Sequence, residues 1–158
     1  MADQDAPPQI EDEDAVPSLF DHPDGVDWFL AQQVHQAEGY QIQQGITLNV
    51  GGVLVAGTLI GGRDYLQGLS EYMKIKTKGT PSEEWGEILG DNVKMLVDIY
   101  PARQGDEDYP YRPYTYIHLK DARVIGSGGY ISAAEGGYWR GKLTAVDGFF
   151  FGEMSVGK

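Results

Sequence analysis

Apolar residues at helical spacing predict the first element of the chain. From Val26 to Ala37 they recur every three or four positions, which places them on one face of a helix. Asp24 stands where its side chain can cap the helix N-terminus, and Gly39 is typical of a helix C-terminus. We therefore expect an N-terminal helix that ends before the first strands.

Two apolar runs separated by a glycine pair predict a β-hairpin. Residues 46–50 and 53–60 are rich in Val, Leu and Ile, and Gly51-Gly52 can adopt the positive φ angles of a two-residue turn. Residues of the first run that are two apart are expected to share one face. Gly57, inside the second run, indicates a sharp bend or a bulge in that strand.

A helical segment is predicted to be inserted at residues 63–100. A short helix is expected from Arg63 to Lys76. A second helix follows the run 80–83 (Thr-Pro-Ser-Glu), which has the spacing of a capping box with proline at the first helical position. This second helix carries an apolar stripe that consists of Trp85, Ile88, Leu89, Val93, Leu96, Val97 and Tyr100.

The C-terminal third is predicted to hold a loop followed by strands. Residues 101–114 are rich in proline, acid and tyrosine, which is typical of a loop. Asp147-Gly148 is a strong hairpin signal, so the last two strands are expected to pair. The expected strands are 115–125, 138–146 and 149–154. The order of elements predicts an α+β fold, with a small, strongly bent antiparallel β-sheet or barrel, an N-terminal helix and an inserted helical segment.

Charge is unevenly distributed over the 158 residues. The formal net charge is −12, with 24 acids against 12 bases, and residues 1–62 contain no Lys or Arg. We expect residues 1–23 to be a disordered acidic tail and residues 24–158 to be a single globular domain. The tail can serve solubility alone or act as an electrostatic arm toward a basic partner. The acidic balance disfavours nucleic acid as the main partner.

The chain shows no signal for a membrane or for secretion. No basic and apolar leader is readable at the N-terminus. The uncharged stretch 39–62 is too rich in glycine and glutamine for a helix that faces lipid. We therefore expect a cytoplasmic protein without membrane contact.

Residues that carry catalytic chemistry are not apparent. The absence of cysteine excludes disulfides, Cys-ligated zinc and thiol catalysis. The histidines, His22, His35 and His118, lack the spacing of metal ligands, and His118 is expected on the solvent side of a strand. Residues 136–142 match the start of a phosphate-binding loop, but Leu143 replaces the required Ser or Thr. We expect no enzyme, no cofactor and no metal, and favour a binding or assembly role.

Aromatic residues supply the best signal for an interaction surface. Four tyrosines lie between positions 109 and 116, beside two prolines and an arginine. Tyrosine provides a large contact area at low entropic cost, although these rings can equally cover a sheet edge. The run 149–151 (Phe-Phe-Phe) cannot face one core, because strand residues alternate sides; at least one ring is exposed unless helices cover both faces. The candidate surface is Tyr109, Tyr111, Arg112, Tyr114, Trp139, Arg140, Phe149, Phe150 and Phe151.

Two blocks of sequence resemble a known family. The first is 46–66, and the second joins 116–124 (Tyr-Ile-His-Leu-Lys-Asp-Ala-Arg-Val) to 139–152, which contains Trp-Arg-Gly-Lys and Val-Asp-Gly-Phe-Phe-Phe. Together they resemble the gas vesicle accessory protein U (GvpU) family over about residues 25–154. The resemblance implies a non-enzymatic accessory protein in the cytoplasm that promotes vesicle formation and clustering. It further implies binding to the gas vesicle shell protein and self-association as a homo-oligomer.

A second resemblance concerns the fold. The segment 57–59 (Gly-Thr-Leu), Asp64 and the pair Arg140-Gly141 are similar to the signature segments of Sm-like small barrels. This likeness implies an RNA-binding or assembly module as the alternative function. Gly68 stands where Sm-like proteins place an asparagine against a base.

Overall fold

A computed structural model describes residues 25–102, 109–126, 129–130 and 136–155. The predicted acidic tail lies outside the described residues, as does part of the predicted loop. In chain order the elements are α1 (Trp28–Tyr40), β1 (Gln44–Val50), β2 (Val53–Ile60), α2 (Gly62–Thr77), α3 (Glu83–Met95), the 3-10 helix η1 (Val97–Ile99), β3 (Tyr116–Gly126), β4 (Gly129–Tyr130), β5 (Gly137–Lys142), the 3-10 helix η2 (Leu143–Ala145) and β6 (Gly148–Phe151).

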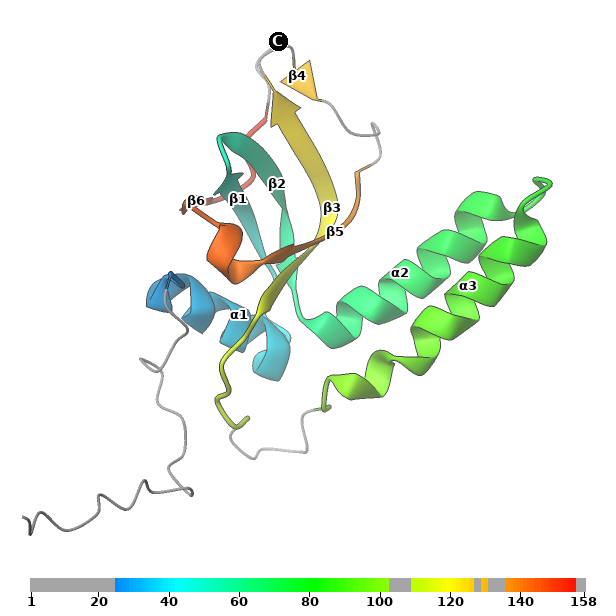
Figure 1. Ribbon diagram of the computed structural model, residues 1–158, viewed down its shortest axis with the longest axis horizontal. Coiled ribbons are helices and arrows are strands. Elements are labelled where there is room, and N and C mark those ends of the chain that lie inside the picture. The colour runs from blue at the N-terminus through cyan, green and yellow to red at the C-terminus, as the bar shows by residue number, and fades with distance from the viewer. Residues whose placement is uncertain (1–24, 103–108, 127–128, 131–135, 156–158) are drawn as a thin grey trace, which may run out of the picture.

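The strands form one antiparallel sheet that is open at both edges. Its order is β6, β1, β2, β3, and both β4 and β5 pair with the far side of β3. One helix precedes the sheet, and α2 and α3 are inserted between β2 and β3 (Figure 1). The predicted α+β class with an inserted helical segment is therefore confirmed, and the sheet does not close into a barrel.

The hairpin predicted at Asp147-Gly148 is wrong. β5 pairs with β3 and β6 pairs with β1, so the two last strands lie at opposite edges of the sheet. Between them η2 buries Leu143 and carries the chain across the sheet. Asp147 then binds to the neighbouring hairpin: its N–H donates to the Asn49 carbonyl at 2.9 Å, and its carboxylate accepts from Gly51 N–H at 2.8 Å. Long-range pairing thus overrides the local turn signal.

The first hairpin forms as predicted. Gly51 and Gly52 have φ angles of 58° and 83°, which an L side chain adopts with strain. The register between β2 and β3 shifts on either side of Gly57. A Cβ atom at Gly57 would lie 2.9 Å from the Lys120 carbonyl oxygen, so this glycine allows two backbones to approach at the bulge.

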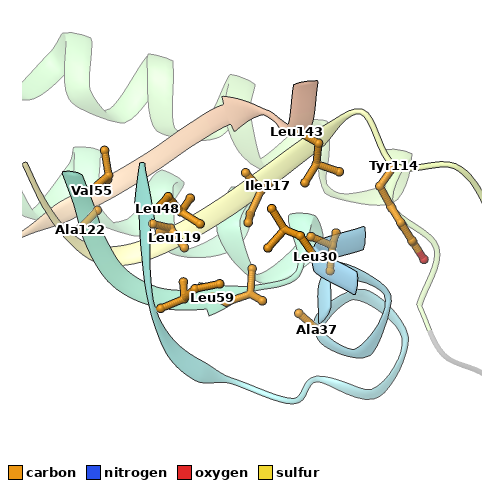
Figure 2. Packing of buried hydrophobic residues seen from close by; sticks show 12 residues of the cluster. Leu30, Ala37, Leu48, Val55, Leu59, Tyr114, Ile117, Leu119, Ala122 and Leu143 are labelled. Carbon is orange, nitrogen blue, oxygen red and sulfur yellow. The ribbon is translucent and has the colours of Figure 1, made fainter. Parts of the chain in front are cut away.

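The core lies between α1 and the concave face of the sheet. Alternate residues of β1, such as Ile46 and Leu48, are fully buried there, as expected for a strand with one face in the core. Helix α1 contributes one apolar stripe, and η2 closes the end of the core (Figure 2). The cluster consists of Leu30, Val34, Ala37, Ile46, Leu48, Val55, Leu59, Tyr114, Ile117, Leu119, Ala122 and Leu143.

The ends of α1 differ from the prediction by a few residues. Asp27 caps the N-terminus, and its carboxylate accepts from the N–H groups of Phe29 and Leu30 at 2.8 and 3.0 Å. The left-handed C-cap is Gln41 with φ of 54°, two residues beyond Gly39. Gly39 serves packing instead, because a Cβ atom there would lie 2.5–2.6 Å from the side chain of Tyr109.

Helices α2 and α3 form a hairpin that projects away from the sheet (Figure 1). Two glycines of α3, Gly86 and Gly90, face α2, and the Ser70 hydroxyl donates to the Gly90 carbonyl at 2.7 Å. A Cβ atom at Gly90 would lie 2.9 Å from the Ser70 carbonyl oxygen. The capping box expected between Thr80 and Glu83 does not form: the Thr80 hydroxyl accepts from Ser82 N–H at 3.2 Å, and the Glu83 carboxylate accepts from Gly79 N–H at 2.9 Å.

Replacing Gly57 by Ala tests the backbone contact at the bulge. The added methyl group meets the Lys120 carbonyl and the Ala122 Cα at 2.9 and 3.1 Å, and neither backbone can yield without moving a strand. We expect a loss of about 1–3 kcal/mol in the free energy of unfolding. Gly148→Ala is the matched control, because its Cβ atom would meet nothing within 4 Å. Urea denaturation that gives equal midpoints for both variants would contradict this account.

Candidate functional site: a buried polar centre and two exposed apolar surfaces

His118 lies in the interior, so its predicted exposure is wrong. Its side chain is 1% exposed, while Ile117 and Leu119 face the core on the other side of β3. Helix α2 covers this second face: the Tyr65 ring lies 4.8 Å from the imidazole between centroids. Simple alternation failed here because both faces of β3 are covered.

The two nitrogens of His118 have different surroundings. Nε2 lies 3.3 Å from Arg140 Nε and 3.4 Å from the Tyr100 hydroxyl. Because a guanidinium only donates, Nε2 is the acceptor and Nδ1 carries the hydrogen. Nδ1 faces the Glu38 carboxyl at 3.7 Å, which is beyond hydrogen-bond length, and it has no hydrogen-bond partner among the described residues.

Glu38 reaches from α1 to the start of α2. Its Oε1 accepts from Gly62 N–H at 2.8 Å, and this bond satisfies a helix end whose own N-cap is a glycine. Burial raises the pKa of Glu38 to about 7, against the smaller lowering effect of the Gly62 hydrogen bond. Burial, and secondarily the charge of Arg140, lower the pKa of His118 to about 3. The two groups are therefore not an ion pair at neutral pH.

A second histidine organises the tyrosines that precede β3. His35 Nδ1 and the Tyr114 hydroxyl are 2.8 Å apart, and the rings of Tyr109 and Tyr111 lie 5.9 and 5.2 Å from the imidazole. Burial lowers the pKa of His35, and the charge of Arg112 acts in the same direction. The tyrosine segment is thus packed on α1.

The candidate surface predicted from the sequence is divided by the fold. Tyr109 and Tyr114 are buried, so they do not offer an exposed surface. Gly39 leaves room for the Tyr109 side chain, and Tyr114 packs in the hydrophobic core. Half-buried positions are Tyr111, Arg112, Trp139 and Phe149. Exposed positions are Arg140, Phe150 and Phe151.

Aromatic rings from both ends of the chain meet at the β6 edge. Phe29 lies 6.0 Å from Phe149 and 5.8 Å from Phe151, and Trp28 lies 5.6 Å from Phe29. Three of these rings are exposed, and Phe150 points to the other side of the strand, where it is 57% exposed. We call these five residues the aromatic edge. Sequence reasoning missed Trp28 and Phe29 as members, because about 120 residues separate them from β6.

Helix α3 turns most of its apolar stripe toward solvent. The glycines face α2, and the large side chains lie on the other side of the helix. Exposed are Trp85, Ile88 and Leu89 of α3, together with Leu96 directly after it and Ile99 of η1; we call these five residues the α3 stripe. The sequence signal for this orientation is the pair Gly86 and Gly90, which lie four residues apart on the face of α3 that contacts α2. Small residues at this spacing permit close contact between two helices.

In the described part of the chain, no group of three His, Asp or Glu side chains could hold a metal ion. Helices in the same residues are too short or too polar to cross a bilayer.

Exposed apolar surfaces on a small α+β fold are typical of a binding or assembly protein. Comparison with protein families identifies which one: the family described as gas vesicle protein GvpU-like matches residues 27–154. The chain belongs to this family, and it is therefore a gas vesicle accessory protein. No curated protein and no solved structure gave a significant match.

Because the pKa of Glu38 is raised, we expect the effect of Glu38→Gln on the stability of the fold to depend on pH. Glutamine keeps an oxygen for Gly62 N–H and removes the charge. The pKa of Glu38 in the folded protein, about 7, exceeds the ordinary value of 4.5 for a glutamate. Folding therefore takes up a proton between these pH values, and the natural protein loses stability as pH rises through that window. We expect the variant to be more stable at pH 8 by roughly 2–3 kcal/mol, with the gain fading toward pH 5.

Thermal melts of both proteins from pH 5 to pH 8 measure this difference. His118, whose lowered pKa acts in the opposite direction, is present in both proteins and cancels in the comparison. Glu71→Gln removes an exposed acid from α2 and is the control. A difference in stability between the two proteins that stays constant from pH 5 to pH 8 would contradict the raised pKa of Glu38.

Proposed function

We propose that this accessory protein promotes the formation and clustering of gas vesicles in the cytoplasm by cross-linking them. The α3 stripe binds the vesicle shell protein, and the aromatic edge joins copies of the chain. The observation that supports this proposal is that exposed apolar side chains occur on two elements, α3 and β6, which lie on opposite sides of the molecule (Figure 1). A cross-linker needs two such surfaces, because one surface alone would coat a vesicle without connecting it to another.

The α3 stripe suits a contact with a large assembly. Its side chains are exposed, and α3 belongs to a helical hairpin that projects away from the sheet (Figure 1). Trp85 is 66% exposed and supplies the kind of anchor that dominates many interfaces. An amphipathic helix with a free apolar face is a recurring mode of protein recognition.

The aromatic edge suits self-association. Strand β6 pairs with β1 on one side, and no described strand occupies its other side. An open edge with unpaired N–H and C=O groups can pair with a strand of another copy, and the aromatic side chains beside it add buried apolar area. Strand β5 forms the opposite edge of the sheet, so pairing of β6 with β5 of another copy would propagate head to tail.

Substitution of the α3 stripe should abolish attachment to vesicles. In a flotation assay, purified protein is mixed with isolated gas vesicles, centrifuged, and measured in the floating layer. We expect the natural protein to float and the double variant Trp85→Ser, Leu89→Ser to bind at least about tenfold more weakly, since buried aromatic anchors carry much of an interface's binding energy. Ile42→Ser, which removes an exposed apolar side chain outside both surfaces, is the control. Natural protein that stays below dispersed vesicles would overturn shell binding.

Substitution at β6 should separate binding from clustering. We expect Phe150→Ser and Phe151→Ser together to leave flotation intact, because both side chains are exposed and far from α3. Clustering, followed by light scattering of the vesicle suspension, should fall. At protein concentrations high enough for the natural chain to associate, sedimentation velocity should show smaller species for the variant. A folded variant that clusters vesicles as well as the natural protein would exclude this edge as the joining surface.

A further inference from the structure

A cavity of about 290 Å³ lies beside the buried polar centre. Its walls come from α1, the end of η1, the segment before β3, and β5. Its lining residues include Glu38, Tyr100, Arg112, Tyr114, Tyr116 and Arg140. Its size is close to the lower end of the range of small-molecule sites, which is about 300 Å³. Of the α3 stripe only Ile99 lines it, and no residue of the aromatic edge does.

The two arginines of this cavity have no acidic partner among the described residues. Arg112 donates to the Tyr109 hydroxyl at 3.2 Å, and Arg140 donates to His118 and lies over the Tyr116 ring at 3.6 Å. Of the other cations in the described residues, Arg63 pairs with Asp98 at 3.0 Å and Lys74 pairs with Asp91 and Glu87, whereas Lys120 donates to Gln43 at 2.7 Å.

Both arginines therefore lack a salt bridge to any described residue, in a chain with twice as many acids as bases. Their charge acts on the neighbouring groups: after burial, Arg112 is the second cause that lowers the pKa of His35, and Arg140 is the second cause for His118. The cavity is therefore a region of positive potential in an acidic protein, and such a region attracts anions.

The free hydrogen-bond donors indicate the chemistry of the anion. A guanidinium has five N–H donors, and each of these two uses one of them in a hydrogen bond between described residues. The remaining donors match the oxygens of a phosphate or a carboxylate. Two positive charges favour a phosphomonoester, which carries nearly two negative charges at neutral pH, over a single carboxylate. The tyrosine rings supply a surface on which a planar group can stack.

We propose that this cavity binds a small phosphomonoester with a planar ring, of the class of nucleoside monophosphates, with its phosphate between Arg112 and Arg140. Glu38 is the one described acid that lines the cavity. When its carboxyl is protonated it does not repel the phosphate, and when ionised it does. The proposal goes beyond vesicle binding and clustering, and it does not depend on them.

Isothermal titration of the full chain with AMP tests the site. We expect saturable binding, no measurable binding of adenosine, and a loss of affinity of about tenfold or more in Arg112→Gln and in Arg140→Gln. Arg140→Lys keeps the charge and should recover part of the affinity. Lys142→Gln is the matched control, because it removes a charge from the same strand without lining the cavity.

A second variant distinguishes a phosphate site from a structural effect. Glu38→Gln should bind AMP more tightly than the natural chain at pH 8, by about threefold or more, because a nearby negative charge is removed. Damage to the fold would weaken binding instead. The proposal is overturned if AMP does not bind at millimolar concentration, if adenosine binds equally well, if neither arginine variant changes the affinity, or if a short 5′-phosphorylated RNA binds while AMP does not.

Discussion

The contact between the end of α1 and the Gly61-Gly62 junction determines the arrangement of the whole structure. A Cβ atom at Gly61 would lie 2.9 Å from the Ala37 carbonyl oxygen, so only glycine permits this approach without a shift of the backbone. One residue later, Gly62 N–H donates to the Glu38 carboxyl at 2.8 Å. Close packing and a buried hydrogen bond together fix the direction in which α2 leaves the sheet.

That direction has two consequences for function. It makes the α2–α3 hairpin project from the sheet, which separates the α3 stripe from the aromatic edge (Figure 1). It also holds Glu38 between α2 and the cavity lined by Arg112 and Arg140. One buried carboxyl is therefore linked to both features: its ionisation changes the stability of the α1–α2 junction and the charge of the cavity at the same time.

Local signals in the sequence were sufficient for much of the fold. The glycine pair at 51–52 defines a hairpin, and Gly57 marks a bulge, because turn and bulge geometry depend on backbone freedom at one or two positions. The partner of β6 was not predictable in this way. Asp147-Gly148 has the composition of a tight turn, but β6 pairs with β1 across the sheet, and that choice depends on η2 and on contacts distant in sequence.

The candidate site was less predictable than the fold, for related reasons. His118 alternates with two core residues, yet α2 covers its face, and no local pattern contains that information. Tyr109 lies in a predicted loop, where an exposed side chain is expected. Gly39 leaves room for that side chain against α1 instead. In α3 the hydrophobic stripe is visible in the sequence, whereas its orientation depends on two glycines that carry no hydrophobic signal.

Exposed apolar surfaces on one molecule raise the question of why copies do not associate without limit. The formal net charge of −12 supplies a repulsion that every copy shares, and ten of the acids lie in residues 1–62. Such repulsion acts over about 8–10 Å at physiological ionic strength, whereas apolar contacts act only on close approach. Free copies in dilute solution are therefore kept apart. Under the proposed function, copies held on one shell by the α3 stripe would be at a high local concentration, where weak contacts at the aromatic edge would become effective. The acidic charge and the apolar surfaces would then act together and confine association to the vesicle surface.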